Sequence, residues 1–332
     1  MAAACLGAAG LGLLPALVLA QGAPSLALPI ACEIGKTCIV QNYVDHDPGQ
    51  PGARDYRCGL LTYDGHKGTD IRVVAFAAYR QGVAVLAAAP GRVRAVRDGM
   101  PDVSVRTTGK QAIAGKEAGN SVVIEHGDGW ETQYAHMRKG SIAVRAGDTV
   151  QAGHAVGVVG LSGSTEFAHL HFEVRHRGKT VDPFIGPVAG AACQPGDRPL
   201  WQQQALNALS YVATGVVDAG ISGAPPKLAD GSVDRDKTES LTAASGAAVF
   251  WVQIYGARAG DIEESKLFGP DGRVLAERRG PIDHNKAQWL AYVGKRSKTG
   301  WANGTYRGEY SLYRDSESTK LLSITREMRI GG

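Results

Sequence analysis

The sequence predicts a mainly β protein of two domains. The chain has 332 residues, which allows two domains of ordinary size. Glycine contributes 44 of them, nearly twice the usual share of about 7%, and this suits a chain with many tight turns. Hydrophobic residues make up 44%, which is enough for a core and excludes disorder of the whole chain. Short β-branched runs alternate with turn signals.

The first predicted domain, residues 60–186, is an antiparallel β-sheet without long helical periodicity. Asp128-Gly129 lies between two apolar runs and is a strong hairpin signal. The polar segment 99–119 predicts a long inserted loop, either at the rim of a substrate groove or idle on the surface. The strands that we expect are 83–88, 91–96, 121–125, 131–135 and 156–159.

The pattern breaks at residues 187–199, which we interpret as a linker. Residues 200–332 are predicted to form a smaller accessory domain, an immunoglobulin-like β-sandwich, with a short helix inside 201–213. This half contains one histidine, His284, and no constellation of catalytic residues in its sequence. Its expected strands are 247–255, 289–293, 306–313 and 320–325.

Residues 1–20 have the features of a signal peptide. The apolar run at 11–20 is shorter than the ~20 residues that span a bilayer, and Val18 and Ala20 give a small-x-small cleavage pattern. No Lys or Arg precedes the run, so an uncleaved membrane anchor is the alternative. We expect a periplasmic or secreted protein without stable membrane insertion after cleavage.

The cysteines predict two disulfides. Cys5 lies within the signal segment, and an even number in an exported chain favours pairing of the other four. Three pairings are possible and the sequence leaves them open. A structural zinc site is the alternative, but the spacing of the first close pair does not suit one. We expect residues 21–59 to pack on the first predicted domain, 60–186. The four candidates are Cys32, Cys38, Cys58 and Cys193.

The net charge of +4 is small, and the basic residues are scattered along the chain. Nucleic-acid interfaces need blocks of Lys and Arg, so this class of partner is excluded. The oligomeric state is not predicted.

Eight of the nine histidines fall between residues 46 and 176. Side chains alternate along a strand, so His66 and Asp70 share a face if this segment is extended, as do His169 and His171. Two histidines and a carboxylate form the protein ligands of an open catalytic zinc site. Further histidines, such as His136, would then serve in proton transfer and oxyanion stabilisation.

Five segments together resemble the lysostaphin-type zinc endopeptidases, over about 120 residues and in the order of that family. The resemblance implies an antiparallel β-sheet peptidase domain with one Zn²⁺ per chain. It also implies that His66, Asp70 and His171 are the zinc ligands and that His136 and His169 are the catalytic pair. The segments are GHKGTDI (65–71), GVAVLAAAPGRV (82–93), GNSVVIEHGDGWETQYAHM (119–137), VRAGDTVQAGHAVGVVGLSGST (144–165) and AHLHFEVRHRGKTVDP (168–183).

The same resemblance implies a function: hydrolysis of amide bonds in peptidoglycan stem peptides or cross-bridges by a zinc-activated water. Two alternatives stay open. One is a non-catalytic protein that binds the cell wall or activates an amidase, although none of the five site residues is substituted. The other is a secreted metalloprotease that acts on protein substrates.

Two tyrosines are weaker candidates for the substrate groove. Tyr63 precedes His66 by three residues, and Tyr134 shares a predicted strand face with His136. Packing in the core is the alternative for both side chains.

Overall fold

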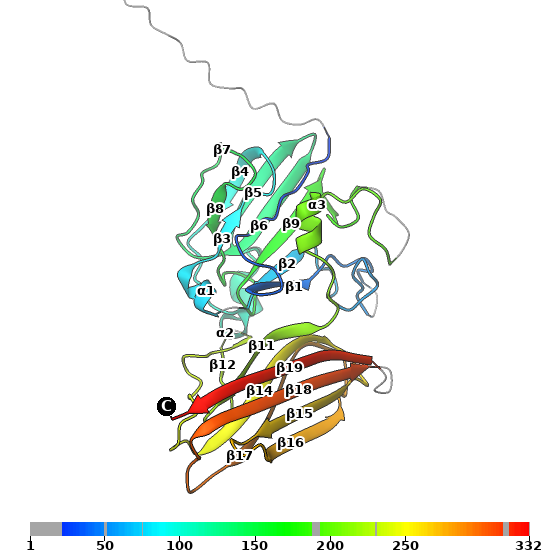
Figure 1. Cartoon of the computed structure of the whole chain (residues 1–332). Helices are drawn as coiled ribbons and strands as arrows, with labels where there is room; N and C mark the ends of the chain where they lie inside the picture. The colour runs from blue at the N-terminus through cyan, green and yellow to red at the C-terminus, as the bar shows by residue number, and fades with distance from the viewer. Residues whose placement is uncertain are drawn as a thin grey trace, which may run out of the picture.

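Two β-rich parts of the chain lie one above the other in the computed structural model (Figure 1). The structure describes residues 22–49, 52–74, 76–187, 193–229, 231–314 and 319–331. The predicted signal peptide, 1–20, lies outside the described residues. Within them, no helix is long and apolar enough to cross a membrane.

The upper part is built on an eight-stranded antiparallel sheet in the order β1-β2-β9-β6-β5-β4-β7, with β10 paired to β9. A two-stranded sheet, β3-β8, lies beside it. The mainly antiparallel β fold is therefore as predicted. The strands are β1 (Cys38–Asn42), β2 (Thr69–Val73), β3 (Ala84–Leu86), β4 (Gly91–Arg97), β5 (Asn120–Gly127), β6 (Trp130–Met137), β7 (Thr149–Val150), β8 (Ala155–Val158), β9 (His169–His176) and β10 (Lys179–Val181).

Helices are short and peripheral. The inserted segment 99–119 carries two of them, and Ser104 caps the first by accepting a hydrogen bond from the backbone N–H of Arg106. The helices are α1 (Phe76–Gln81), α2 (Val105–Thr108), the 3₁₀ helix η1 (Lys110–Ile113) and α3 (Gln203–Ala208).

The N-terminal segment joins the first domain through both its backbone and its apolar side chains. β1 pairs with β2 in antiparallel register, and Leu26 and Ile30 are buried in the core of this domain. The two predicted disulfides are present, and the structure pairs Cys32 with Cys38 and Cys58 with Cys193. The second disulfide links the segment before β2 to the chain that follows β10.

The lower part consists of two antiparallel sheets that share a second hydrophobic core. One has the order β11-β14-β17 and the other β16-β15-β18-β19, and a hairpin of β12 (Leu228–Ala229) and β13 (Ser232–Val233) is separate. The strands are β11 (Gly215–Ser222), β14 (Ala247–Ala257), β15 (Ile262–Phe268), β16 (Val274–Pro281), β17 (Lys286–Arg296), β18 (Gly304–Arg314) and β19 (Thr319–Ile330).

The segment after the predicted linker packs into the first core. Trp201, Ala205 and Leu209 are buried there, around the short helix α3, although we assigned residues from 200 onwards to the accessory domain. We therefore propose a boundary near residue 210. Tyr255 of β14 also belongs to the first core, so the two domains share an apolar contact.

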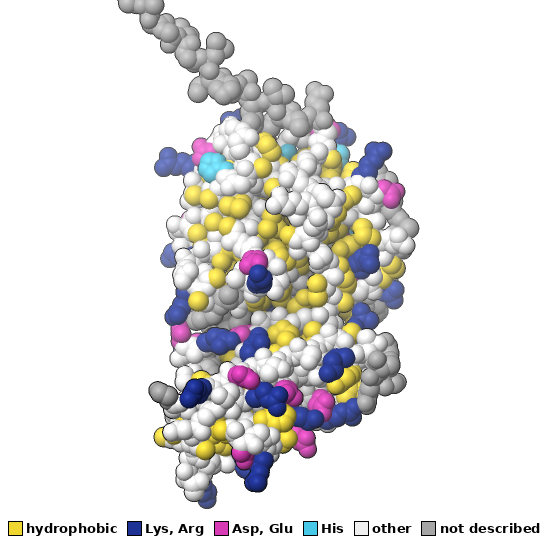
Figure 2. All heavy atoms as spheres, viewed as in Figure 1, with side chains coloured by type: hydrophobic (Ala, Val, Ile, Leu, Met, Phe, Trp, Pro, Cys, Tyr) yellow, Lys and Arg dark blue, Asp and Glu magenta, His cyan; other side chains and the backbone are white. Residues whose placement is uncertain are grey.

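Charged side chains are dispersed over the surface. On the face in Figure 2, Lys and Arg are mixed with Asp and Glu over both domains, and no large patch of one sign is visible. This distribution agrees with the scattered charges of the sequence.

Candidate metal centre

Two neighbouring strands bring the predicted metal ligands together. β2 and β9 pair so that Asp70 lies opposite His171 and Arg72 lies opposite His169. Side chains two residues apart on a strand share a face, so Asp70, His169 and His171 converge on one side of the sheet. The period-two pattern of the sequence thus placed the two histidines of β9 correctly.

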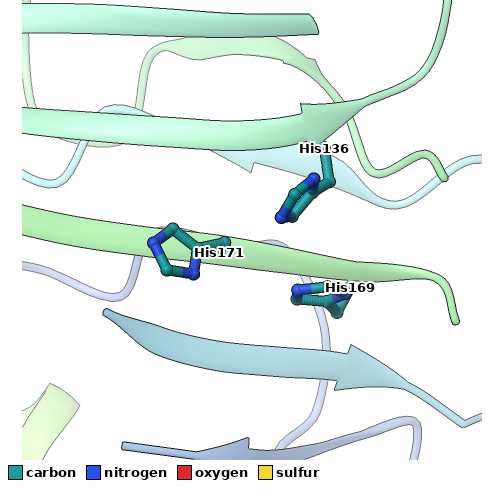
Figure 3. Close-up of side chains that lie close together, drawn as sticks. All are labelled: His136, His169 and His171. Atoms are coloured by element: carbon teal, nitrogen blue, oxygen red, sulfur yellow. The ribbon is translucent and has the colours of Figure 1, made fainter. Parts of the chain in front are cut away.

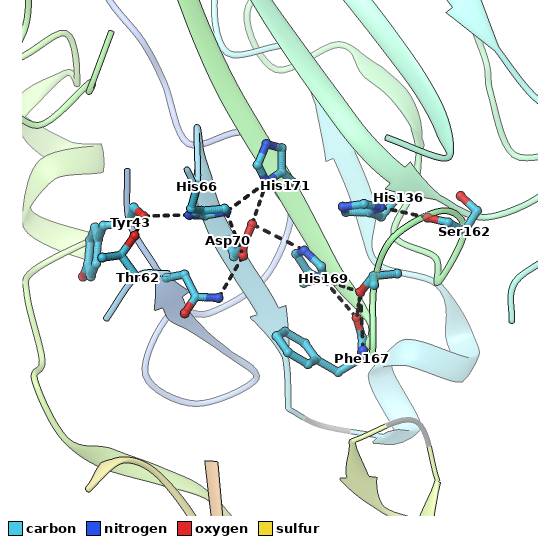
Figure 4. A network of polar contacts seen from close by, with 11 residues as sticks. Tyr43, Thr62, His66, Asp70, His136, Ser162, Phe167, His169 and His171 are labelled. Carbon is cyan, nitrogen blue, oxygen red and sulfur yellow. Dashed lines mark hydrogen bonds and ion pairs between the residues drawn. The ribbon is translucent and has the colours of Figure 1, made fainter. Parts of the chain in front are cut away.

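The carboxylate of Asp70 is at the centre of the cluster (Figure 4). Its Oδ1 lies 2.8 Å from Nδ1 of His171 and 3.4 Å from Nε2 of His169. Its Oδ2 lies 3.1 Å from Nε2 of His66 and accepts a 2.9 Å hydrogen bond from the side-chain amide of Asn42. One ligand atom each from His66, Asp70 and His171 lie within 4.8 Å of one another. These three groups could therefore hold a metal ion together.

His66 reaches the cluster from a turn and not from a strand. β2 begins at Thr69, the residue before His66 is Gly65 with φ +72°, and the backbone N–H of His66 donates to the carbonyl of Tyr63. The extended geometry that we expected for this pair is therefore wrong. Nδ1 of His66 lies 2.7 Å from the carbonyl oxygen of Tyr43. A carbonyl only accepts, so Nδ1 carries the hydrogen and Nε2 keeps its lone pair toward Asp70.

A β-bulge turns His136 into the site. The register of β5 and β6 shifts next to it, and His136 has φ +61°, a left-handed conformation that is uncommon outside glycine. The shift breaks the alternation, so Tyr134 faces the core while His136 faces the cluster. Tyr134 is fully buried, and its hydroxyl accepts the backbone N–H of Ala88 at 2.7 Å. The prediction that Tyr134 lines the groove is therefore wrong.

His136 and His169 face each other beside His171, with 4.7 Å between their ring centroids (Figure 3). Backbone carbonyls orient both rings: Nδ1 of His136 lies 2.8 Å from the oxygen of Ser162, and Nδ1 of His169 lies 2.9 Å from that of Phe167. Each Nδ1 therefore donates, which leaves Nε2 of each ring as an acceptor. His136, His169 and His171 form a second group with metal-binding spacing.

Burial and mutual charge set the protonation of the cluster. Burial raises the pKa of Asp70, but His66 and His169 outweigh it and hold this pKa well below its ordinary value. Burial lowers the pKa of His66, yet the neighbouring Asp70 raises it overall. The pKa of His136 is well below normal because of burial and then the nearby His169 and His171. Asp70 is thus ionised and His136 is neutral at neutral pH.

A cavity of about 320 Å³ opens beside the cluster. Asp70 and His169 line it, and so does Tyr63, whose ring centroid is 4.5 Å from that of His66. Tyr63 is 56% exposed, so the structure places this weaker candidate at the cavity. Lys110 also lines the cavity and belongs to segment 99–119, for which the sequence left open a place at the rim of a groove. Ala287 and Gln288, from the other domain, are lining residues that the sequence did not indicate.

Two strands and the turn before β2 bring two histidines and an aspartate together as a ligand set, with two more histidines beside them, and this is the composition of a metallopeptidase site. Residues 64–183 match the sequence model of peptidase family M23. The resemblance that the motifs carry is therefore confirmed for this domain.

Curated relatives match the chain over this same domain. The peptidoglycan DD-endopeptidase ShyA of Vibrio cholerae is 37% identical over 78 residues, covering 24% of this chain and 18% of the relative. The murein hydrolase activator NlpD of Escherichia coli is 34% identical over 119 residues, covering 36% of this chain and 25% of the relative. The chain spans a quarter or less of the length of these relatives.

A solved structure with similarity to this chain is the catalytic domain of the prophage-encoded M23 protein EnpA from Enterococcus faecalis. It shares 25% identity, covers 46% of this chain and 95% of its own, and has a TM-score of 0.33.

Proposed function

We propose that the protein is a zinc-dependent endopeptidase that hydrolyses amide bonds in peptidoglycan peptides. The observation that carries this proposal is the cluster itself. A buried carboxylate and two imidazoles converge with their ligand atoms within 4.8 Å, and two further histidines face the same point. Relatives named as a peptidoglycan endopeptidase and a murein hydrolase activator support the choice of substrate.

The donor set suits one zinc ion per chain. Zinc binds imidazole nitrogen and carboxylate oxygen, and three protein ligands leave a position open for water or substrate. The carbonyl of Tyr43 fixes the ring of His66 so that Nε2 is available, which is how outer partners orient ligand histidines. When bound, zinc would polarise a carbonyl group and lower the pKa of water. We assign His66, Asp70 and His171 as its ligands.

His136 and His169 are proposed as the catalytic pair. Both rings are held by hydrogen bonds from Nδ1 to backbone carbonyls, and each keeps an accepting Nε2. The lowered pKa of His136 keeps its ring neutral, so Nε2 can take the proton of the attacking water. His169, on the same face of β9 as His171, is proposed to hold the attacking water by accepting one of its hydrogens at Nε2; once that nitrogen carries a proton, it would donate to the developing oxyanion.

A digestion experiment separates the three functional hypotheses. Purified peptidoglycan and casein are each incubated with the protein, with and without a zinc chelator, and new amine termini are counted. We expect chelator-sensitive termini from peptidoglycan and none from casein. Cleavage of casein at a comparable rate would support a protein-directed protease. Release of fragments only after a separate amidase is added would support the activator hypothesis.

The remaining predictions about the whole chain stand as proposals. We propose a signal peptide at 1–20 and export to the periplasm or outside the cell. We also propose that the C-terminal domain is an immunoglobulin-like sandwich, because two antiparallel sheets of three and four strands pack around one core.

A further inference from the structure

The C-terminal domain reaches the cavity beside the metal cluster. Ala287 and Gln288, at the start of β17, line the same 320 Å³ cavity as Asp70 and His169. The accessory domain therefore supplies one wall of the space in which a substrate would lie. No other part of that domain among the described residues lines this cavity.

Buried amides hold this wall in place. The side-chain nitrogen of Gln41, a residue of β1 that is 1% exposed, donates to the carbonyl of Ala287 at 3.2 Å. The side-chain nitrogen of Gln253, which is 3% exposed, donates to Oε1 of Gln288 at 3.3 Å. Because the oxygen of Gln288 is used within the protein, its amide nitrogen is the group left to donate into the cavity.

A buried guanidinium ties the wall to the strand that carries Asp70. Arg72 of β2 is fully buried, and its amino groups donate to Gln41 at 3.0 Å and to Gly231 and Ser232 of the C-terminal domain at 2.9 Å. Its guanidinium lies 4.5 Å from the ring centroid of Phe167, whose carbonyl orients His169. A buried cation is costly to leave without partners, so these contacts fix the two domains at a set distance.

The charges around the cavity favour an anionic ligand. Glu166 lines it but forms an ion pair with Arg106 at 2.6 Å, and Asp70 is surrounded by imidazoles. Lys110 of η1 also lines the cavity, and no carboxylate among the described residues pairs with it. The cavity thus offers an ammonium and a carboxamide N–H, both of which bind carbonyl and carboxylate oxygen.

We propose that the space between the metal cluster and β17 is a substrate subsite for a carboxylate-bearing peptide, in which Gln288 donates to a peptide oxygen and Lys110 binds the carboxylate. This inference rests on the proposed peptidase function. It makes the C-terminal domain part of the substrate site and not a separate attachment module.

The test uses the full-length zinc-loaded protein and two stem-peptide substrates that differ only in a free carboxylate or a carboxamide. Gln288→Ala should raise KM for both peptides about fivefold while kcat changes less than about twofold, because one hydrogen bond to a neutral peptide oxygen is lost. Lys110→Gln should abolish the preference for the carboxylate peptide. Gln288→Glu keeps the size of the side chain but adds a negative charge. It should therefore weaken binding of the carboxylate peptide more than binding of the carboxamide peptide.

Gln203→Ala, on the exposed surface of α3, is the matched control and should leave KM unchanged. Zinc content and calorimetric binding of both peptides are measured for every variant. Normal cleavage with unchanged KM and Kd in the Gln288 and Lys110 variants would overturn the subsite and leave the peptidase function intact. Binding that depends on Gln288 and Lys110 without any cleavage by the unsubstituted protein would support the subsite and overturn the function. Absence of binding would overturn the subsite.

Discussion

The two domains bury charged groups in different ways. In the C-terminal domain, Asp261 is 2% exposed and accepts two hydrogen bonds from Arg314, at 2.8 and 2.7 Å. In the first domain, Asp70 is equally buried but faces three imidazoles. Arginine keeps its protons, whereas imidazole nitrogen exchanges protons or metal near neutral pH. The carboxylate of Asp261 is thus fixed in a structural ion pair, whereas the carboxylate of Asp70 is available to bind a metal or a proton. We call Asp261 the closed carboxylate and Asp70 the open carboxylate.

The largest effect should come from removing the open carboxylate. Asp70→Ala deletes the anionic member of the proposed ligand set, so bound zinc should be lost and peptidase activity should fall by at least about 10³-fold. Metal analysis of the purified variant and a peptidoglycan cleavage assay measure both. If the variant kept one zinc per chain, Asp70 would not be a ligand.

Removing either histidine of the proposed catalytic pair should separate metal binding from turnover. His136→Ala and His169→Ala leave the three proposed ligands intact, so zinc content should stay the same while kcat falls about 10²–10⁴-fold. Steady-state kinetics on a stem peptide together with metal analysis give the two readouts. Full activity of either variant would contradict its assigned role.

Removing the closed carboxylate should cost stability without affecting the metal. Asp261→Ala leaves Arg314 partly buried without its partner, and we expect a loss of about 3 kcal/mol in the free energy of unfolding. Urea denaturation measures this loss, and the zinc content should match that of the unsubstituted protein. Loss of zinc in this variant would contradict the independence of the two carboxylates.

A glycine in each domain offers a matched pair of smaller changes. A Cβ on Gly68 would lie 2.6 Å from Cε1 of His171, so Gly68→Ala should displace that ring and weaken zinc binding about 10–100-fold. A Cβ on Gly308 would clash with the buried ring of Phe250, so Gly308→Ala should lower stability instead. Zinc titration measures the zinc affinity of both variants. A larger loss of zinc affinity in Gly308→Ala than in Gly68→Ala would contradict this account.

Proton competition should give the smallest effect. Although burial lowers the pKa of His66, Asp70 raises it overall, so a proton occupies the proposed ligand as pH falls. Zinc must displace that proton, and its affinity should drop about tenfold per pH unit below this pKa. Calorimetry in buffers of different ionisation enthalpy would detect the released proton. Affinity that stays constant from pH 7.5 to 5.5 would contradict the assignment of His66.

The sequence predicted most strands and their faces correctly where side chains alternate regularly between the two faces of a strand. It placed His169 and His171 on one face of β9, and it found most of the longer apolar strands. It missed β11, although burial alternates along that strand, and it missed β15, whose buried face includes Glu263 and Ser265. It also missed β16, where most side chains are exposed or half-buried, so this edge strand has little apolar pattern. A strand at the edge of a sheet can be largely exposed, so its sequence lacks the apolar alternation from which a strand is predicted.

Local backbone geometry explains the errors within the site. The bulge at His136 reverses the alternation that placed Tyr134 in the groove, and the turn at Gly65 replaces the strand expected at His66. Neither feature follows from residue type alone. The wall of the cavity depends on Gln41 and Ala287, which are 246 residues apart, so only the folded chain reveals it.

The central claim is that the open carboxylate and its imidazoles form a zinc peptidase site. The most direct test measures zinc per chain and the release of stem-peptide fragments from purified peptidoglycan in a single preparation, with fragments identified by mass spectrometry. We predict one zinc per chain and new amine termini that disappear in His136→Ala. A preparation with neither zinc nor cleavage, after incubation with excess zinc, would contradict the claim.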